Sequence, residues 1–98
     1  MPDDSDLPPI VHDEAGHRWV TTVDGIEGEL TYRRRDDQLT LVHTGVPDEL
    51  GGRGIAGKLV EAALDYARAN DLTVDPQCPY ARHWLEKHPD VAATMKLA

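Results

Sequence analysis

Hydrophobic and polar residues follow different periods in the two halves of the chain. In the first half they alternate along residues 18–23 and again along residues 29–33. A period of two is typical of strands with one buried face. Asp24-Gly25 lies between these runs and has the composition of a tight hairpin turn, while Asp36-Asp37 precedes a third run. The sequence therefore predicts an antiparallel meander that begins near Ile10.

The third run, residues 38–46, differs from the first two because it is apolar on both of its expected faces. Strict alternation would place Leu39, Leu41 and His43 on one face and Val42 and Val46 on the other. A strand that is apolar on both faces is typical of the middle of a sheet. We therefore expect this strand to have neighbours on both sides.

After Pro47 the period changes to that of a helix. Apolar residues recur every three or four positions from Ile55 to Ala67, and Asn70-Asp71 marks the end of this helix. A short strand at residues 72–74, interrupted by Pro76, would complete a strand, helix, strand unit with a parallel pair. Two further helices are predicted at residues 79–87 and 89–95, each with proline at its first position.

The predicted fold class is mixed α/β: an antiparallel meander, a strand-helix-strand crossover and C-terminal helices around one mixed sheet. The length of 98 residues allows one domain, expected at residues 10–98, after a flexible acidic leader at residues 1–9. The core is small and contains no Phe, so we expect a monomer or a weak homodimer.

Composition restricts the partners and the compartment. The formal net charge is −8, which opposes attraction to phosphate backbones, so nucleic acid is not expected as a ligand. No apolar run is long enough for a membrane span, and the acidic N-terminus does not resemble a signal peptide. A lone cysteine, Cys78, suits a reducing compartment. We expect a cytoplasmic protein without a membrane partner.

Candidate chemistry is concentrated between the central strand and the long helix. Four glycines, Gly51, Gly52, Gly54 and Gly57, surround the predicted helix start, and Arg53 and Lys58 add positive charge. Unpaired N–H groups at a helix start attract anions, and glycine lets a phosphate approach the backbone. The segment lacks the Ser or Thr of a P-loop, and its G-x-G-x-x-G spacing does not follow the first strand of a parallel unit.

These residues resemble a known family. Gly51-Gly52-Arg53-Gly54-Ile55-Ala56 is similar to the pyrophosphate loop of the GNAT superfamily of acetyl-CoA-dependent N-acetyltransferases, although Gly51 replaces the usual Gln or Arg. The likeness extends to His43-Thr44-x-Val46-Pro47, to Ala62-Ala63-Leu64-Asp65-Tyr66-Ala67 and to Pro76-x-Cys78-Pro79-Tyr80. In this order the blocks resemble the compact stand-alone YjdJ-type subgroup.

The resemblance implies an acyl-CoA-dependent N-acyltransferase, with acetyl-CoA as co-substrate, that transfers an acetyl group to an amine by direct attack in a ternary complex. It also implies which residues bind coenzyme A: Thr44, Gly45, Val46, Gly52, Arg53, Gly54, Ile55, Ala56, Gly57 and Lys58. The acidic surface would suit a cationic acceptor, a small molecule or a protein lysine. The alternative is a non-catalytic coenzyme A-binding or protein-interaction module, because the helices that usually form the acceptor wall are missing from the sequence.

Three residues are candidates for catalysis, and each has a structural alternative. His43 would act as general base or pack on the sheet. Cys78 would donate a proton or carry an acyl group, or would fill a tight turn. Tyr80 would protonate the departing sulfur or serve packing alone.

Other polar clusters suggest less. The histidines lack metal-ligand spacing, so no metal site is expected. Arg33-Arg34-Arg35 is interpreted as a solvated strand end, which would hold the adenosine phosphate only if the fold brought it near the helix start. Trp19 and Trp84 are assigned to the core.

Overall fold

The computed structural model describes residues 9–50 and 54–98. Residues 1–8 of the predicted leader, and Gly51, Gly52 and Arg53, therefore lie outside the described residues. The sheet has six strands in the order β1-β2-β3-β4-β5-β6, with the first three neighbouring pairs antiparallel and the last two parallel. This is the mixed α/β architecture that the sequence predicts.

The meander consists of β1 (Val11–Asp13), β2 (Arg18–Val23), β3 (Ile26–Arg35) and β4 (Gln38–Gly45). Asp24 and Gly25 both have positive φ, 53° and 79°, as a two-residue hairpin turn with this twist requires. β4 pairs with β3 on one side and β5 on the other. The prediction that residues 38–46 form an interior strand is therefore confirmed.

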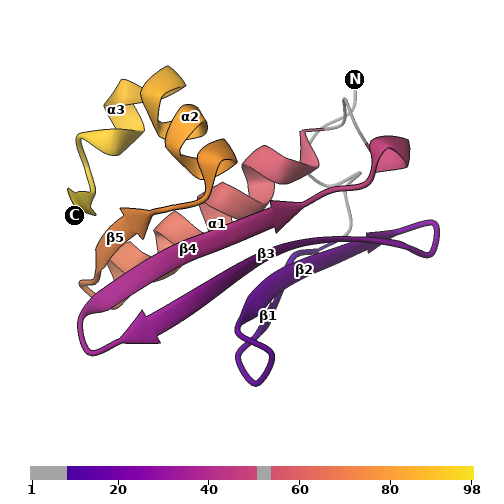
Figure 1. Cartoon of the computed structure of the whole chain (residues 1–98), viewed down its shortest axis with the longest axis horizontal. Helices are drawn as coiled ribbons and strands as arrows, with labels where there is room; N and C mark the ends of the chain where they lie inside the picture. The colour runs from indigo at the N-terminus through magenta and orange to yellow at the C-terminus, as the bar shows by residue number, and fades with distance from the viewer. Residues whose placement is uncertain (1–8, 51–53) are drawn as a thin grey trace.

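The second half begins with a short 3-10 helix, η2 (Asp48–Leu50), and continues with α1 (Ile55–Ala69), β5 (Thr73–Pro76) and α2 (Pro79–Lys87). α1 lies against the sheet and runs opposite to β4, so that its first turn lies near the end of β4 (Figure 1). Pro79 occupies the first position of α2, where its missing N–H has no helical partner to lose.

Three details of the second half differ from the prediction. Pro76 does not interrupt β5 but is its last residue, paired with Leu41; a strand end is where proline removes the fewest ladder hydrogen bonds. The last helix, α3 (Pro89–Ala92), is shorter than predicted. The chain then forms β6 (Lys96–Leu97), parallel to β5, with the Ala98 N–H donating to the Val74 carbonyl at 2.8 Å. Two residues are too few to produce a detectable period.

The core lies between one face of the sheet and α1, with α2 at one side. It contains side chains that are nearly or fully inaccessible to solvent, among them Trp19, Leu30, Tyr32, Leu39, Leu41, Leu59, Leu64, Val74 and Trp84. The assignment of both tryptophans to the core is therefore confirmed. The opposite face of β3 and β4 carries exposed or half-buried side chains.

An irregularity in β4 decides which of its side chains reach this core. Thr31 pairs with His43, but the next residue of β3, Tyr32, pairs with Leu41. Val42 is thus an extra residue, a β-bulge, and the alternation shifts by one position at this point. Thr44 pairs with buried Leu30 and takes the place on the core face that strict alternation would give to His43. The expected face for His43 is therefore wrong, and its side chain is exposed on the opposite face.

Tyr32 contributes to the stability of the fold in a way that is lost at alkaline pH. Its side chain is buried, its hydroxyl lies 2.7 Å from Nε2 of His12, and burial raises the pKa of the phenol. A raised pKa means that the unfolded chain ionises first, so this contribution is complete below pH ~10 and is lost as the pH rises through the folded pKa.

Tyr32→Phe should therefore change the pH profile of stability as well as its level. We expect the variant to lose about 1 kcal/mol near neutral pH, with the hydroxyl hydrogen bond. The difference in free energy of unfolding between the wild type and the variant should become smaller above pH ~10, because tyrosine ionises there and phenylalanine does not. Urea unfolding across this range measures both effects. An undiminished gap in alkali would contradict the role assigned to Tyr32.

Candidate functional site

The first turn of α1 has no side-chain cap from its N-cap residue. Its N-cap is Gly54, which has φ 74° and ψ 13° and no side chain to cap the helix. The first hydrogen bond within the helix runs from the Lys58 N–H to the Gly54 carbonyl, at 3.1 Å. The N–H groups of Ile55, Ala56 and Gly57 precede that bond, and no acidic residue lies in the first turn. Such a turn presents backbone donors and a partial positive charge to an anion.

The structure explains why glycine occupies positions 54 and 57 in this turn. Gly54 adopts the left-handed conformation that residues with a Cβ rarely adopt. At Gly57 a Cβ would lie 3.0 Å from Nε1 of Trp84 and 3.8 Å from the Tyr80 hydroxyl oxygen. Glycine at position 57 therefore allows α1 and α2 to approach closely and keeps this surface free of a side chain.

A depression of about 500 Å³ lies beside this turn, between α1 and α2. Its floor contains Trp84, 8% exposed, whose ring stacks on His88 with a centroid separation of 3.9 Å. The lining also includes Gly54, Gly57, Lys58, Glu61, Tyr80, His83 and Lys87. Aromatic area beside lysine and histidine side chains suits a flat ring that carries phosphate.

Apart from Tyr80, the prediction missed the α2 side of this depression. His83, Trp84, Lys87 and His88 recur at helical spacing and thus share one stripe of α2. That spacing is a detectable signal, but the prediction considered the histidines only as metal ligands. In the described residues, no three His, Cys, Asp or Glu side chains are grouped so that they could hold a metal ion.

The edge of β4 supplies the second part of the site. β4 pairs with β5 from Gln38 to Leu41 and continues to Gly45 beyond the last β5 residue, Pro76. At that point the chain turns away, and the Cys78 N–H donates to the Leu41 carbonyl at 2.8 Å. Thr44, Gly45 and Val46, the residues expected to bind pantetheine, lie just past this separation and are half-buried.

Cys78 and Thr44 meet where the two strands part. The Cys78 sulfur lies 3.2 Å from the Thr44 hydroxyl oxygen, and the residue is only 2% exposed. Cys78 is the N-cap of α2, as predicted, with extended backbone and no side-chain capping bond. The thiol therefore lies in the core, where Thr44 is its side-chain hydrogen-bond partner among the described residues.

The three catalytic candidates lie in different surroundings. Cys78 is inside the core, Tyr80 lines the depression beside the first turn of α1, and His43 is exposed on the far face of the sheet. Burial raises the pKa of the Tyr80 phenol although the residue is 39% exposed, so its hydroxyl stays protonated at neutral pH. The structure thus brings Tyr80 to the open helix start and does not bring His43 to Cys78.

The arginine run does not reach the helix start. Arg33, Arg34 and Arg35 end β3, at the opposite end of the sheet from the first turn of α1 (Figure 1). Their side chains are exposed, so the interpretation as a solvated strand end is confirmed. The arginines would hold the adenosine phosphate only if the fold brought them near the helix start, and it does not.

The chain is similar to known proteins over most of its length. A family model described as GCN5-related N-acetyl-transferase matches residues 18–94. The chain is 43% identical over 83 residues to Protein NATD1 of Gallus gallus, covering 82% of this chain and 76% of that protein. For Protein NATD1 of Homo sapiens the identity and aligned length are the same, and 74% of that protein is covered.

A solved structure has the same fold. It is the NMR solution structure of a GCN5-like protein from Staphylococcus aureus, which superposes with a TM-score of 0.71. The sequences are 33% identical, and the match covers 92% of this chain and 87% of the other.

In the described ranges, no helix is both long and apolar enough to cross a bilayer.

Proposed function

Because the chain belongs to the GCN5-related N-acetyltransferase family, we propose that it binds acetyl-CoA at the start of α1 and transfers the acetyl group to an amine by direct attack in a ternary complex. The observation that carries the proposal is the first turn of α1, whose N-cap, left-handed Gly54, has no side chain to cap it, beside the depression between α1 and α2. The charge of this turn suits a diphosphate, and the shape of the depression suits the adenosine of the same ligand.

The backbone does most of the binding in this proposal. The N–H groups of Ile55, Ala56 and Gly57 donate to the diphosphate, and Gly54 keeps the approach open. Lys58 and Lys87 supply positive charge at the depression. Gly52 and Arg53, outside the described residues, are assigned to the same phosphate on the sequence resemblance alone. The edge of β4 at Thr44 and Gly45, together with Val46 just after it, receives the pantetheine amides.

The transfer needs few protein groups. The neutral amine attacks the thioester carbon, the carbon–sulfur bond breaks, and the sulfur takes a proton as the nitrogen loses one. Tyr80 is the proposed proton donor to sulfur, because its hydroxyl is protonated at neutral pH and lies beside the open turn. The net charge of −8 favours a cationic acceptor such as a polyamine or a lysine side chain.

Tyr80→Phe should lower kcat by about tenfold without changing the dissociation constant of coenzyme A. The effect is modest because a thiolate with an ordinary pKa near ~8.5 leaves fairly well without an acid. Tyr66→Phe is the matched control and should keep full activity; it removes from α1 a phenol hydroxyl that accepts a hydrogen bond from Arg34 of β3. Equal kcat in the Tyr80 variant and the wild type would reassign Tyr80 to packing.

One observation favours the alternative of a non-catalytic module. His43, proposed as general base, faces away from the core side where Cys78 and Thr44 meet. Two measurements separate the alternatives: calorimetry with coenzyme A, and thiol release from acetyl-CoA with a panel of polyamines and lysine peptides. Binding with turnover is expected. Binding without turnover on any amine would favour the module, and no binding at millimolar coenzyme A would contradict both.

A further inference from the structure

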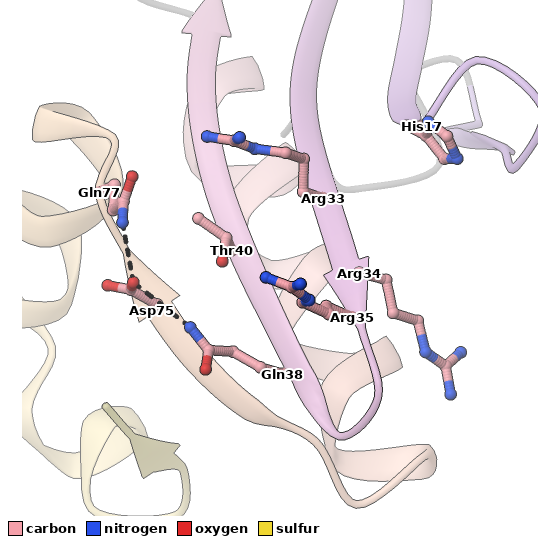
Figure 2. A pocket seen from close by; sticks show the side chains of 8 residues that line it. All are labelled: His17, Arg33, Arg34, Arg35, Gln38, Thr40, Asp75 and Gln77. Carbon is pink, nitrogen blue, oxygen red and sulfur yellow. Dashed lines mark hydrogen bonds between the residues drawn. The ribbon is translucent and has the colours of Figure 1, made fainter.

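On the face of the sheet opposite α1, we propose a binding site for a small dianion that carries a phosphate group. Arg33 and Arg35 of β3 are its anion-binding residues. A depression of about 540 Å³ lies at this place, lined by these arginines with side chains of β4, β5 and the following turn. Figure 2 shows α1 behind the strands and the side chains of Arg33, Thr40 and Gln38 on the near face.

The register of the sheet brings the lining residues together. Arg33 pairs with Thr40 and Arg35 with Gln38 across β3 and β4, and Thr40 pairs with Asp75 of β5. Residues two apart in a strand share a face, as do directly paired residues. Two guanidinium groups, one hydroxyl and one amide therefore form a compact grid of donors that points away from the core.

Among the described residues, no carboxylate neutralises the two arginines of this grid, Arg33 and Arg35, by an ion pair, although the chain has 18 acidic residues. By contrast, Arg18 on β2 contacts Asp13 at 3.2 Å, Glu27 at 2.5 Å and Glu29 at 3.0 Å. Two like charges side by side repel each other, and an anion bridging them removes that repulsion.

Asp75, the carboxylate nearest in the register, is held by amides. Its Oδ2 accepts a hydrogen bond from Nε2 of Gln77 at 2.9 Å and a longer one from Nε2 of Gln38 at 3.5 Å, as the dashed lines in Figure 2 show. The carboxylate thus stays beside the arginines without pairing with them.

The chemistry favours a small ligand over a polyanion. Guanidinium groups bind phosphate oxygens through paired hydrogen bonds, and the volume suits a small molecule. The net charge of −8 repels an extended polyanion over many residues, whereas a small dianion meets the local field of Arg33 and Arg35. The site also lies away from the helix start and shares no lining residue with the depression there.

The test is a titration of the ¹⁵N-labelled protein with glycerol 3-phosphate, with and without saturating coenzyme A, followed through the arginine Nε–Hε and backbone amide resonances. Shifts are expected at Arg33, Arg35 and Thr40 in both series, with glycerol as an uncharged reference that causes none. Any coenzyme A response should appear separately at the start of α1. A failure of this site is therefore distinguishable from a failure of the proposed function.

The double variant Arg33→Gln, Arg35→Gln should bind glycerol 3-phosphate at least about tenfold more weakly, since charge-assisted hydrogen bonds are lost. Both side chains are exposed, so its thermal midpoint should stay close to that of the wild type. Arg68→Gln, which removes an exposed arginine paired with Asp65, is the control and should bind normally. Unchanged affinity in the double variant, or equal loss in the control, would overturn the proposal.

Two further measurements define the ligand class. Asp75→Asn removes a neighbouring negative charge and should strengthen phosphate binding by about threefold; weaker binding would contradict the placement of the anion. A hexaglutamate peptide tests the competing possibility of an acidic protein segment. It should bind more weakly than glycerol 3-phosphate. Tighter binding of the peptide through Arg33 and Arg35 would show that the ligand is an acidic protein segment and not a small dianion.

Discussion

Ala56→Asp should weaken coenzyme A binding by about 100-fold while the protein stays as stable as the wild type or becomes slightly more stable. Ala56 is the second residue of α1 and half-buried, and its N–H precedes the first hydrogen bond within the helix. A carboxylate there would lie a few ångströms from the bound diphosphate, and like charges at that distance cost several kcal/mol at intermediate dielectric. The same carboxylate interacts favourably with the helix dipole, by about 0.5 kcal/mol.

The opposite signs of these two effects make the substitution informative, because a loss of binding cannot then be attributed to unfolding. Ala56→Asn is the matched control, with nearly the same shape and no charge, and should bind coenzyme A within about threefold of the wild type. Calorimetry and urea unfolding measure the two quantities. Similar affinity of the Asp and Asn variants for coenzyme A would show that the diphosphate lies elsewhere.

Leu41→Ala should have the reverse effect, with a large loss of stability and little change in affinity. Leu41 is fully buried, forms the last pair between β4 and β5, and its carbonyl accepts the Cys78 N–H. Truncating such a side chain costs about 3 kcal/mol, because transfer free energy is lost and a cavity remains. In a domain of this size that loss lowers Tm by about 15 °C.

Leu97→Ala is the matched control for this substitution, because it removes the same atoms from a leucine that is 43% exposed. Its free energy of unfolding should change by no more than about 0.5 kcal/mol. At a temperature well below both transitions, each variant should bind coenzyme A as the wild type does. Comparable destabilisation by the two substitutions would contradict the burial assigned to Leu41.

The parts of the fold that were predictable are those with a local physical signal. Asp24-Gly25 requires positive φ and thus a hairpin, and apolar residues at helical spacing define α1 up to Asn70. Pro79 likewise indicated the start of α2. Each of these features depends on residues that are neighbours in the sequence, so composition and spacing were sufficient.

The β-bulge at Val42 had no such signal. Alternation along β4 predicts a core position for His43, and only pairing with β3 shows the extra residue that moves Thr44 there. Pairing across a sheet is set by contacts distant in sequence, so a one-residue shift is invisible to periodicity. The prediction missed β6 for a related reason, because Lys96–Leu97 forms a strand only by pairing with β5.

The candidate site was predictable in its backbone half and less so in its side chains. Gly54, Ile55, Ala56 and Gly57 lie at the start of α1, where the glycine pattern indicated a helix start. Its wall from α2, with Trp84 beside Gly57, depends on how two helices pack. The catalytic roles of His43, Cys78 and Tyr80 remain predictions for the variants to test.

A crystal structure of the complex with coenzyme A tests the central claim most directly. We predict that diphosphate oxygens lie within hydrogen-bonding distance of the backbone N–H groups of Ile55, Ala56 and Gly57, with the adenosine between α1 and α2. A diphosphate bound away from the first turn of α1, or this turn occupied by the protein's own side chains in the complex, would contradict the account.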